Sequence, residues 1–464
     1  MVYTGAALGI FVLLSLAAAR TITFDAGEIS NAAPWLLVGL WLVAVAGATG
    51  LMPLDATTWL ALPGRAAYAP VVKDFLTPVL QVTQLTFALD AQAAAVSASV
   101  AIGGLAVTAI ALTISRNAAL SLLGLIACVA VAQAILGLVQ LALGSPSFLA
   151  FANAVGGARA SGTFINKNHF ASLLAMALPV LVMRATGHFR FADDPRPSGA
   201  LRNGWWAIAT AVVVAALVSS VSRAGLAAGS LAAGAAALAA LSSAQEPHRR
   251  ILLTVIVVAG LALSAFSGFG LLMKSIEGDA FVQSAAGRQA LYAAAWPAAL
   301  DFFPVGSGLG SFAIAFPRYQ PAALAGFYEH AHNDYLQFIF ELGALGILIL
   351  GAWLLAFSLV ATRILRSRRD GRALASPAAA CLLGCLALAM HSWFDFPTHI
   401  PGLAWIACVL AALSTRADLL GATPQTDVVP RKSRRQSGRS VDFPPPATVA
   451  EYAVRKAAHS PAAQ

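Results

Sequence analysis

Two histidines stand in a dense polar segment, residues 328–337 (YEHAHNDYLQ), of a chain that is otherwise strongly hydrophobic. A histidine titrates near neutral pH, so His330 or His332 could take a proton from a hydroxyl group. In an extended segment, residues two apart share a face. Two histidines without a third ligand at coordinating spacing are weak evidence for a metal site, and we predict none. Asn333 or Asp334 is expected to cap a helix that begins just after them.

Two arginines stand in segments suited to an anion. Arg223 occupies a very short connection between two apolar runs and has no acidic neighbour in sequence. Its side chain either reaches the membrane interface or binds an anion, because a guanidinium offers five donors in a planar fork that fits phosphate. Arg288 precedes Leu, Tyr and Trp residues that predict an amphipathic helix lying along the membrane surface.

Further polar residues stand at the ends of other apolar runs. Asn166 and Asn168 lie at the entry of one run, where helix capping is an alternative to a binding role. The glycines of 306–310 (GSGLG) predict a tight turn that lets the backbone approach another group closely. They lack the Lys-Ser/Thr pair of a phosphate-binding P-loop. His391 and Asp395 close another run and could either support a site or be structural.

The elements that carry these residues are predicted to be membrane-spanning helices. The chain is 59% hydrophobic and 11% charged, with a mean hydropathy of +0.77. Its apolar runs are long enough to cross a bilayer, and they show none of the alternation of barrel strands. We predict an all-α membrane protein of about 11 to 12 transmembrane helices with one large outer loop, residues 273–338. The apolar runs are 4–20, 33–52, 94–113, 119–143, 169–184, 204–219, 224–242, 250–272, 339–362, 377–394 and 400–415.

The basic residues predict how these helices are oriented. If the 273–338 loop lies outside, most of the 29 Lys and Arg residues fall on the cytoplasmic side, as is typical of membrane proteins. Residues 1–415 are then the polytopic domain. Residues 416–464, rich in Arg, Pro and Ala, are predicted to be a disordered basic cytoplasmic tail. We expect that tail to contact anionic lipid and not nucleic acid.

The order and spacing of these motifs resemble a known family of membrane enzymes. The matching segments are 162–168 (GTFINKN), 222–225 (SRAG), 287–288 (GR) with Trp296, 306–310 (GSGLG) with Phe312, 332–337 (HNDYLQ) with 341–343 (ELG), and His391 with Asp395. In this order they look like the O-antigen ligase and O-antigen polymerase superfamily. The resemblance covers about residues 150–415.

This resemblance implies a metal-independent, inverting glycosyltransferase of the polytopic C-type fold, without a cofactor. It implies a bacterial inner (plasma) membrane protein whose active site faces the periplasm, which makes 273–338 a periplasmic loop. The donor is an undecaprenyl-diphosphate-linked glycan, whose diphosphate Arg223 and Arg288 would bind. His332 would activate the acceptor hydroxyl. The residues expected to support these three or to bind the acceptor are His330, Asn333, Asp334, Asn166, Asn168, His391 and Asp395.

The acceptor is the open question. Lipid A–core would make the protein an O-antigen ligase of lipopolysaccharide biosynthesis, which the two arginines and the histidine favour. A growing glycan would make it an O-antigen or exopolysaccharide polymerase, and a protein serine a protein O-oligosaccharyltransferase. A transporter of a lipid-linked solute is disfavoured, because we find no internal repeat and no charge at mid-depth. An intramembrane protease is disfavoured because His391 and Ser392 are adjacent and point apart on a helix.

Overall fold

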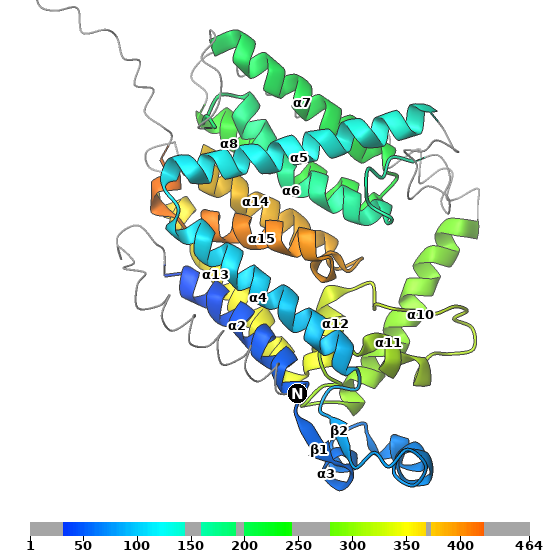
Figure 1. Cartoon of the computed structure of the whole chain (residues 1–464). Helices are drawn as coiled ribbons and strands as arrows, with labels where there is room; N and C mark the ends of the chain where they lie inside the picture. The colour runs from blue at the N-terminus through cyan, green and yellow to red at the C-terminus, as the bar shows by residue number, and fades with distance from the viewer. Residues whose placement is uncertain (1–30, 144–158, 192–198, 244–278, 368–372, 422–464) are drawn as a thin grey trace, which may run out of the picture. The chain divides into compact units, whose positions relative to one another are not determined.

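The structure, a computed structural model, describes residues 31–143, 159–191, 199–243, 279–367 and 373–421 (Figure 1). The described chain is mostly helical and has one small two-stranded sheet, which confirms the predicted all-α class. The predicted spans 4–20 and 250–272 lie outside the described residues, as does the predicted tail beyond 421.

Nine apolar helices make up the described part of the bundle. Those long and apolar enough to cross a membrane are α4 (Ala91–Thr113), α5 (Arg116–Leu143), α6 (Lys167–Ala185), α8 (Arg223–Ser243) and α13 (Ala344–Arg366). The shorter ones are α2 (Ala33–Thr49), α7 (Gly199–Ser219), α14 (Pro377–His391) and α15 (Pro401–Ser414). Each overlaps a span predicted from hydropathy, although α13 covers only part of the span predicted at 339–362.

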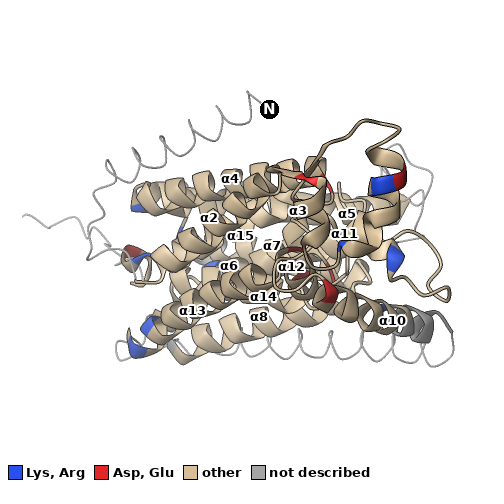
Figure 2. Ribbon diagram, turned by 90° about the horizontal axis from the view of Figure 1, so that it is seen from below, with Lys and Arg blue, Asp and Glu red and all other residues tan. Residues whose placement is uncertain are grey.

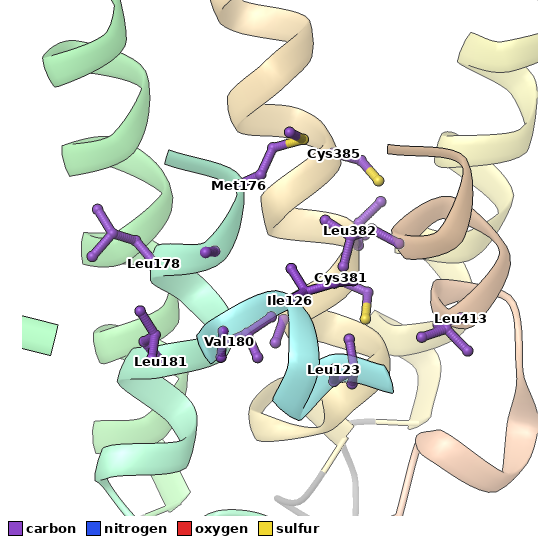
Figure 3. Close-up of a cluster of buried hydrophobic side chains, with 14 of the residues drawn as sticks. Leu123, Ile126, Met176, Leu178, Val180, Leu181, Cys381, Leu382, Cys385 and Leu413 are labelled. Atoms are coloured by element: carbon purple, nitrogen blue, oxygen red, sulfur yellow. The ribbon is translucent and has the colours of Figure 1, made fainter. Parts of the chain in front are cut away.

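Helix α6 is the centre of the bundle, and α5, α7, α8 and α14 pack around it. Its residues from His169 to Ala185 are all buried. A helix that is buried on every side needs neighbours on every face, and these four helices supply them. Figure 3 labels core side chains from α5 (Leu123, Ile126), α6 (Met176, Leu178, Val180, Leu181), α14 (Cys381, Leu382, Cys385) and α15 (Leu413). This packing fixes the position of the polar first turns of α6.

Large apolar side chains on the outside of the bundle are exposed, and charged side chains gather toward its ends. The exposed ones include Val96, Ile110, Leu125, Leu348 and Leu354. In Figure 2 the coloured Lys, Arg, Asp and Glu residues lie toward the ends of the helices, and their middles are tan. A bilayer core accepts apolar side chains and excludes charged ones. The helices therefore form a multi-pass membrane domain.

Successive helices alternate in direction, so the connections lie at two ends of the bundle. The end where α6 and α8 begin and α14 ends is called the site end below. There the Gln140 side chain of α5 donates to the Gly162 carbonyl at 2.8 Å. At the opposite end Arg416 donates to the Ala111 carbonyl at 3.1 Å and pairs with Asp418 at 2.6 Å. The ordered bundle thus continues past the predicted boundary at residue 415, because Arg416 binds the end of α4.

The predicted span 339–362 is wrong as a single helix. The chain forms α12 (Asp334–Leu342), turns at Gly343, and continues as α13. Gly343 has a φ of +57°, and an added Cβ would lie 2.2 Å from the Pro304 carbonyl oxygen. The hydropathy is continuous across this turn, so only the close approach of another backbone segment reveals it.

The glycine segment 306–310 packs against α12. Gly306, Gly308 and Gly310 all have positive φ, which confirms the predicted tight turn. The buried Glu341 side chain accepts hydrogen bonds from the Gly310 and Phe312 backbone N–H groups at 2.7 and 3.2 Å. Its own backbone carbonyl accepts from the Gly308 N–H at 2.9 Å. The glycine segment is therefore fixed to the helix that follows the histidines.

Residues 53–86, between α2 and α4, form a small subdomain at the site end and contain no spanning helix. Strands β1 (Pro53–Asp55) and β2 (Gln84–Thr86) pair antiparallel, with α3 (Ala56–Ala61), η1 (Ala66–Tyr68) and η2 (Val71–Leu76) between them. The buried Arg65 guanidinium lies over the Trp59 and Phe87 rings, 4.7 and 5.2 Å from their centroids. Just after the subdomain, the Leu89 N–H donates to the Ser307 carbonyl at 3.2 Å, which joins this part of the chain to the glycine segment.

Replacing Gly306 by alanine should destabilise the protein more than the same change at Gly326. Both have positive φ, +83° and +98°, and each substitution strains the backbone by about 1–2 kcal/mol. At Gly306 the Cβ would also lie 2.2 Å from the Glu341 carbonyl oxygen, whereas nothing lies within 4 Å at Gly326. Thermal unfolding in detergent measures both losses, with the helical Gly351→Ala as a reference that has neither penalty, because nothing lies within 4 Å of its added Cβ and its φ is not positive. Equal losses at Gly306 and Gly326 would contradict the packing described above.

Candidate active site

A buried carboxylate and a partly exposed histidine lie together at the site end. Asp395, in the turn between α14 and α15, is completely buried, and its Oδ1 lies 3.4 Å from Nδ1 of His332. The His332 side chain is 33% exposed. The Oδ1 atom also accepts from the Phe396 N–H at 2.9 Å and lies 4.0 Å from Nε2 of His169. Burial alone favours the neutral acid, but His332 and His169 outweigh it and lower the pKa of Asp395 to about 2. The carboxylate is therefore ionised.

Three imidazoles contact the ring of Phe396, the residue that follows Asp395. His330 stacks on the ring at a centroid distance of 4.1 Å. His332 and His169 meet it edge-on, at 5.0 and 4.8 Å. His332 adopts a φ of +50°, so the segment is not uniformly extended as predicted, yet both of its histidines contact the same ring.

His330 and His332 have different surroundings, so the two imidazoles are not equally suited to accept a proton. Nδ1 of His330 lies 3.1 Å from the Gln337 side-chain nitrogen, and Gln337 in turn donates to Glu341 at 2.9 Å. Burial lowers the pKa of His330 to about 3. An imidazole that resists protonation is a poor proton acceptor at neutral pH. His332, by contrast, is partly exposed and lies beside an ionised carboxylate, so its ring is the more accessible of the two from outside the protein.

Asn333 and Asp334 fix the start of α12. The Asn333 side chain accepts from the Leu336 N–H at 3.0 Å, which confirms the predicted helix cap. The Asp334 N–H donates to the Ser392 carbonyl at 2.9 Å, so the histidine segment is bonded to the turn of Asp395. The Asp334 carboxylate pairs with Nδ1 of His399 at 2.8 Å. Both residues therefore position this segment.

The remaining polar residues form a layer behind Asp395. Nδ1 of the buried His391 lies 2.8 Å from the Ser172 hydroxyl of α6. The Asn166 side chain caps α6 by accepting from the Asn168 N–H at 2.9 Å. The Asn168 side chain accepts from the Ser222 hydroxyl at 2.8 Å, which ties the start of α6 to the start of α8. Asn166 thus caps a helix, which was the alternative to a binding role in the sequence prediction.

Basic side chains gather beside this layer. Arg223 is the first residue of α8 and is exposed, and Arg288 lies partly exposed on α10 (Asp279–Asp301). Nζ of Lys167, the first residue of α6, donates to the Val221 carbonyl at 2.8 Å. The positive charges of Arg223 and Arg288 repel each other, and both repel that of Lys167. A bound anion would relieve this repulsion, so the cluster suits a phosphate or diphosphate.

Tertiary packing brings every residue predicted for the site to the same end of the bundle. The sequence did not predict the contacts that His169, Tyr292, Phe396 and His399 make in the site. His169 was visible as a histidine one turn after Asn166, and His399 as a polar residue shortly after Asp395. Tyr292 and Phe396 carry no sequence signal beyond their hydrophobicity.

One family model matches part of the chain. Residues 208–351 match the O-antigen ligase family. The match confirms the resemblance predicted from the motifs, and it supports the O-antigen ligase and polymerase superfamily for this chain. Its range holds Arg223, Arg288 and His332, whereas Asn168 and Asp395 lie outside it. None of the curated proteins matches the chain.

The stability of the protein should depend on pH through His399 and His330 with opposite signs. Burial disfavours a charged His399, but Asp334 and Glu341 outweigh it and raise its pKa. Its contribution is therefore complete below about pH 6.5 and is lost as the pH rises through the folded-state pKa. His330, whose pKa is lowered by burial, contributes stability above about pH 6.5 that is lost as the pH falls.

Thermal unfolding of wild type, His399→Gln and His330→Gln between about pH 5 and pH 9 measures these contributions. The stability difference between wild type and His399→Gln should shrink toward high pH. The difference between wild type and His330→Gln should shrink toward low pH. The same slope for both variants would show that the Asp334–His399 pair does not hold a proton as described.

Proposed function

We propose that this protein is a glycosyltransferase that moves a glycan from undecaprenyl diphosphate to an acceptor hydroxyl on the periplasmic face of the inner membrane. The observation that carries the proposal is the His332–Asp395 pair at the same end of a membrane bundle as Lys167, Arg223 and Arg288. A base beside a cluster of cations suits the transfer of a group whose leaving group is a diphosphate. The O-antigen ligase match over residues 208–351 supports this class of enzyme.

The cations would bind the donor. Arg223, at the start of α8, lies where an α-helical N-terminus adds its own positive dipole end. Arg288 approaches from α10, outside the spanning helices. Between them they would neutralise the diphosphate while negative charge develops on it as the glycosidic bond breaks. The lipid tail of the donor would remain in the bilayer beside the bundle.

His332 would act as the general base. Nδ1 of His332 lies 3.4 Å from the Asp395 carboxylate, and a proton held on Nδ1 would leave the Nε2 lone pair to take the proton from the acceptor hydroxyl. The Asp395 carboxylate would orient the ring and stabilise the imidazolium that forms. The acceptor oxygen then attacks the anomeric carbon as the bond to the diphosphate breaks. A single displacement of this kind inverts that carbon and needs no metal.

The acceptor that we favour is lipid A–core, which makes the reaction O-antigen ligation. The pair of arginines with one histidine supports this choice through the resemblance stated above. Use of a growing glycan as acceptor, which is polymerisation, would require the same donor and the same base. The two reactions differ in their products, so an experiment on the products separates them.

Substitution of the donor and base residues should abolish transfer without affecting membrane insertion. Arg223→Ala, Arg288→Ala and His332→Ala should each reduce transfer by about 10²- to 10⁴-fold, because each removes a charge or proton acceptor used in the transition state. Asp395→Asn should reduce it by about 10- to 100-fold, because the ring loses its orienting carboxylate. Transfer is measured in membranes that contain equal amounts of each variant.

Two control variants test whether the loss of any positive charge or any imidazole is enough to reduce transfer. Lys73→Ala removes an exposed cation from η2, and His188→Gln removes an imidazole that pairs with Thr186. Both should transfer at the wild-type rate. Near-normal activity in Arg223→Ala, Arg288→Ala and His332→Ala together would refute the assignment.

Deletion of the gene in its bacterial host tests the acceptor. Lipopolysaccharide from the deletion strain is compared on a gel with that of strains complemented by wild type and by His332→Ala. Loss of the whole polymer ladder, with lipid-linked polymer left unattached, is the expected result for a ligase. A core that carries a single repeat unit would identify a polymerase instead. An unchanged ladder would exclude both as the function in lipopolysaccharide synthesis.

A further inference from the structure

Tyr292 joins three parts of the site that are far apart in sequence. It lies on α10 four residues after Arg288, and residues four apart on a helix lie on the same face. Its hydroxyl donates to the His332 backbone carbonyl at 2.7 Å. The Trp393 carbonyl oxygen, in the turn that leads to Asp395, lies 3.3 Å from the same hydroxyl. The phenol thus meets the backbone of both segments that carry the His332–Asp395 pair.

The backbone at His332 needs such a contact. A non-glycine residue with positive φ is strained by about 1–2 kcal/mol, so it persists where its surroundings hold it. On the C-terminal side, Asn333 caps α12 and the Asp334 N–H is bonded to the Ser392 carbonyl. The His332 carbonyl itself accepts a hydrogen bond from the Tyr292 hydroxyl. Burial raises the pKa of Tyr292 to about 12, so the phenol keeps its proton and remains a donor.

Helix α10 is the element that this hydroxyl connects to the site. It belongs to the loop outside the spanning helices and packs on α12 through Leu291 and Ala295, which are fully buried. Apolar packing alone permits small rotations and shifts of one helix on another. A hydrogen bond from its face to the His332 carbonyl fixes the register between α10 and the catalytic segment. Because Arg288 lies on the same face, its position is fixed together with that of His332.

We propose that Tyr292 is a positioning residue. Its hydroxyl group holds helix α10, which would bind the donor, in a fixed position relative to the His332 backbone and the turn of Asp395. This inference rests on the proposed function, in which Arg288 holds the donor diphosphate and His332 takes the acceptor proton. The hydroxyl touches neither substrate. It sets the position of Arg288 relative to His332. A misplacement of about 1 Å between reacting groups can lower the rate about 10²-fold.

The test compares Tyr292→Phe with Tyr335→Phe. Tyr335 is a matched control, because its partly buried hydroxyl also donates to a backbone carbonyl, that of Ala389, at 2.6 Å. Each substitution removes one oxygen atom and one hydrogen bond and keeps the ring. Full-length variants are assayed in membranes with lipid-linked glycan extracted from the deletion strain and with that strain's lipopolysaccharide as acceptor.

Tyr292→Phe should lower kcat by about 10- to 100-fold and change the apparent KM for the lipid-linked glycan by less than about threefold. Tyr335→Phe should leave both constants near wild type. Hydrogen exchange measured by mass spectrometry gives a second readout that does not depend on activity. In Tyr292→Phe the amide of Asp334 and its neighbours should exchange faster than in wild type, and in Tyr335→Phe they should not.

Two outcomes would overturn the inference. One is wild-type kcat and wild-type exchange in Tyr292→Phe. The other is equal losses in Tyr292→Phe and Tyr335→Phe, which would reflect general packing. His332→Ala in the same assay separates this inference from the function on which it rests. Activity in His332→Ala refutes the proposed base, whereas an inactive His332→Ala with a fully active Tyr292→Phe refutes the role of Tyr292 alone.

Discussion

The negative charge of Asp395 is completely buried at the end of a membrane bundle, and the arrangement of the site follows from how that charge is stabilised. Desolvation of a carboxylate is costly, so the group stays ionised only if donors and positive partners are held in place. The Phe396 N–H donates to the Asp395 carboxylate, and ring nitrogens of His332 and His169 lie within 4.0 Å of it. They come from the start of α6, the segment before α12 and the turn after α14, so these segments must meet for the charge to exist.

The apolar bundle makes that meeting reproducible. Helix α6 is buried along its length, and its neighbours pack on every face, so its rotation and depth are set by close packing. Its polar residues His169 and Ser172 then lie where Asp395 and His391 require them. The close packing of a long apolar core thus determines the position of a few polar groups at its end.

The outer loop contributes the parts that a bundle of spanning helices cannot. The glycine segment closes on α12 through Glu341, and Glu341 accepts from Gln337, which lies beside His330. Helix α10 brings Arg288 toward the cations that begin α6 and α8. The basic cluster and the buried carboxylate are therefore built on different elements, and hydrogen bonds between loop backbones join them. In the proposed reaction this arrangement separates the binding of the diphosphate from proton transfer.

The sequence by itself determined the class of the fold, the order of the apolar helices, a helix cap at Asn333 or Asp334 and a tight turn in the glycine segment, because each depends on local composition or on one residue type. It also placed the polar motifs at one end, since the direction of successive spans must alternate. The break at Gly343, the pairing of Asp395 with His332, and the roles of His169, Tyr292 and His399 were decided only by the tertiary structure. Hydropathy and helical periodicity carry no distances between residues about 40 to 230 positions apart in sequence, and those distances are set by side-chain packing in the core.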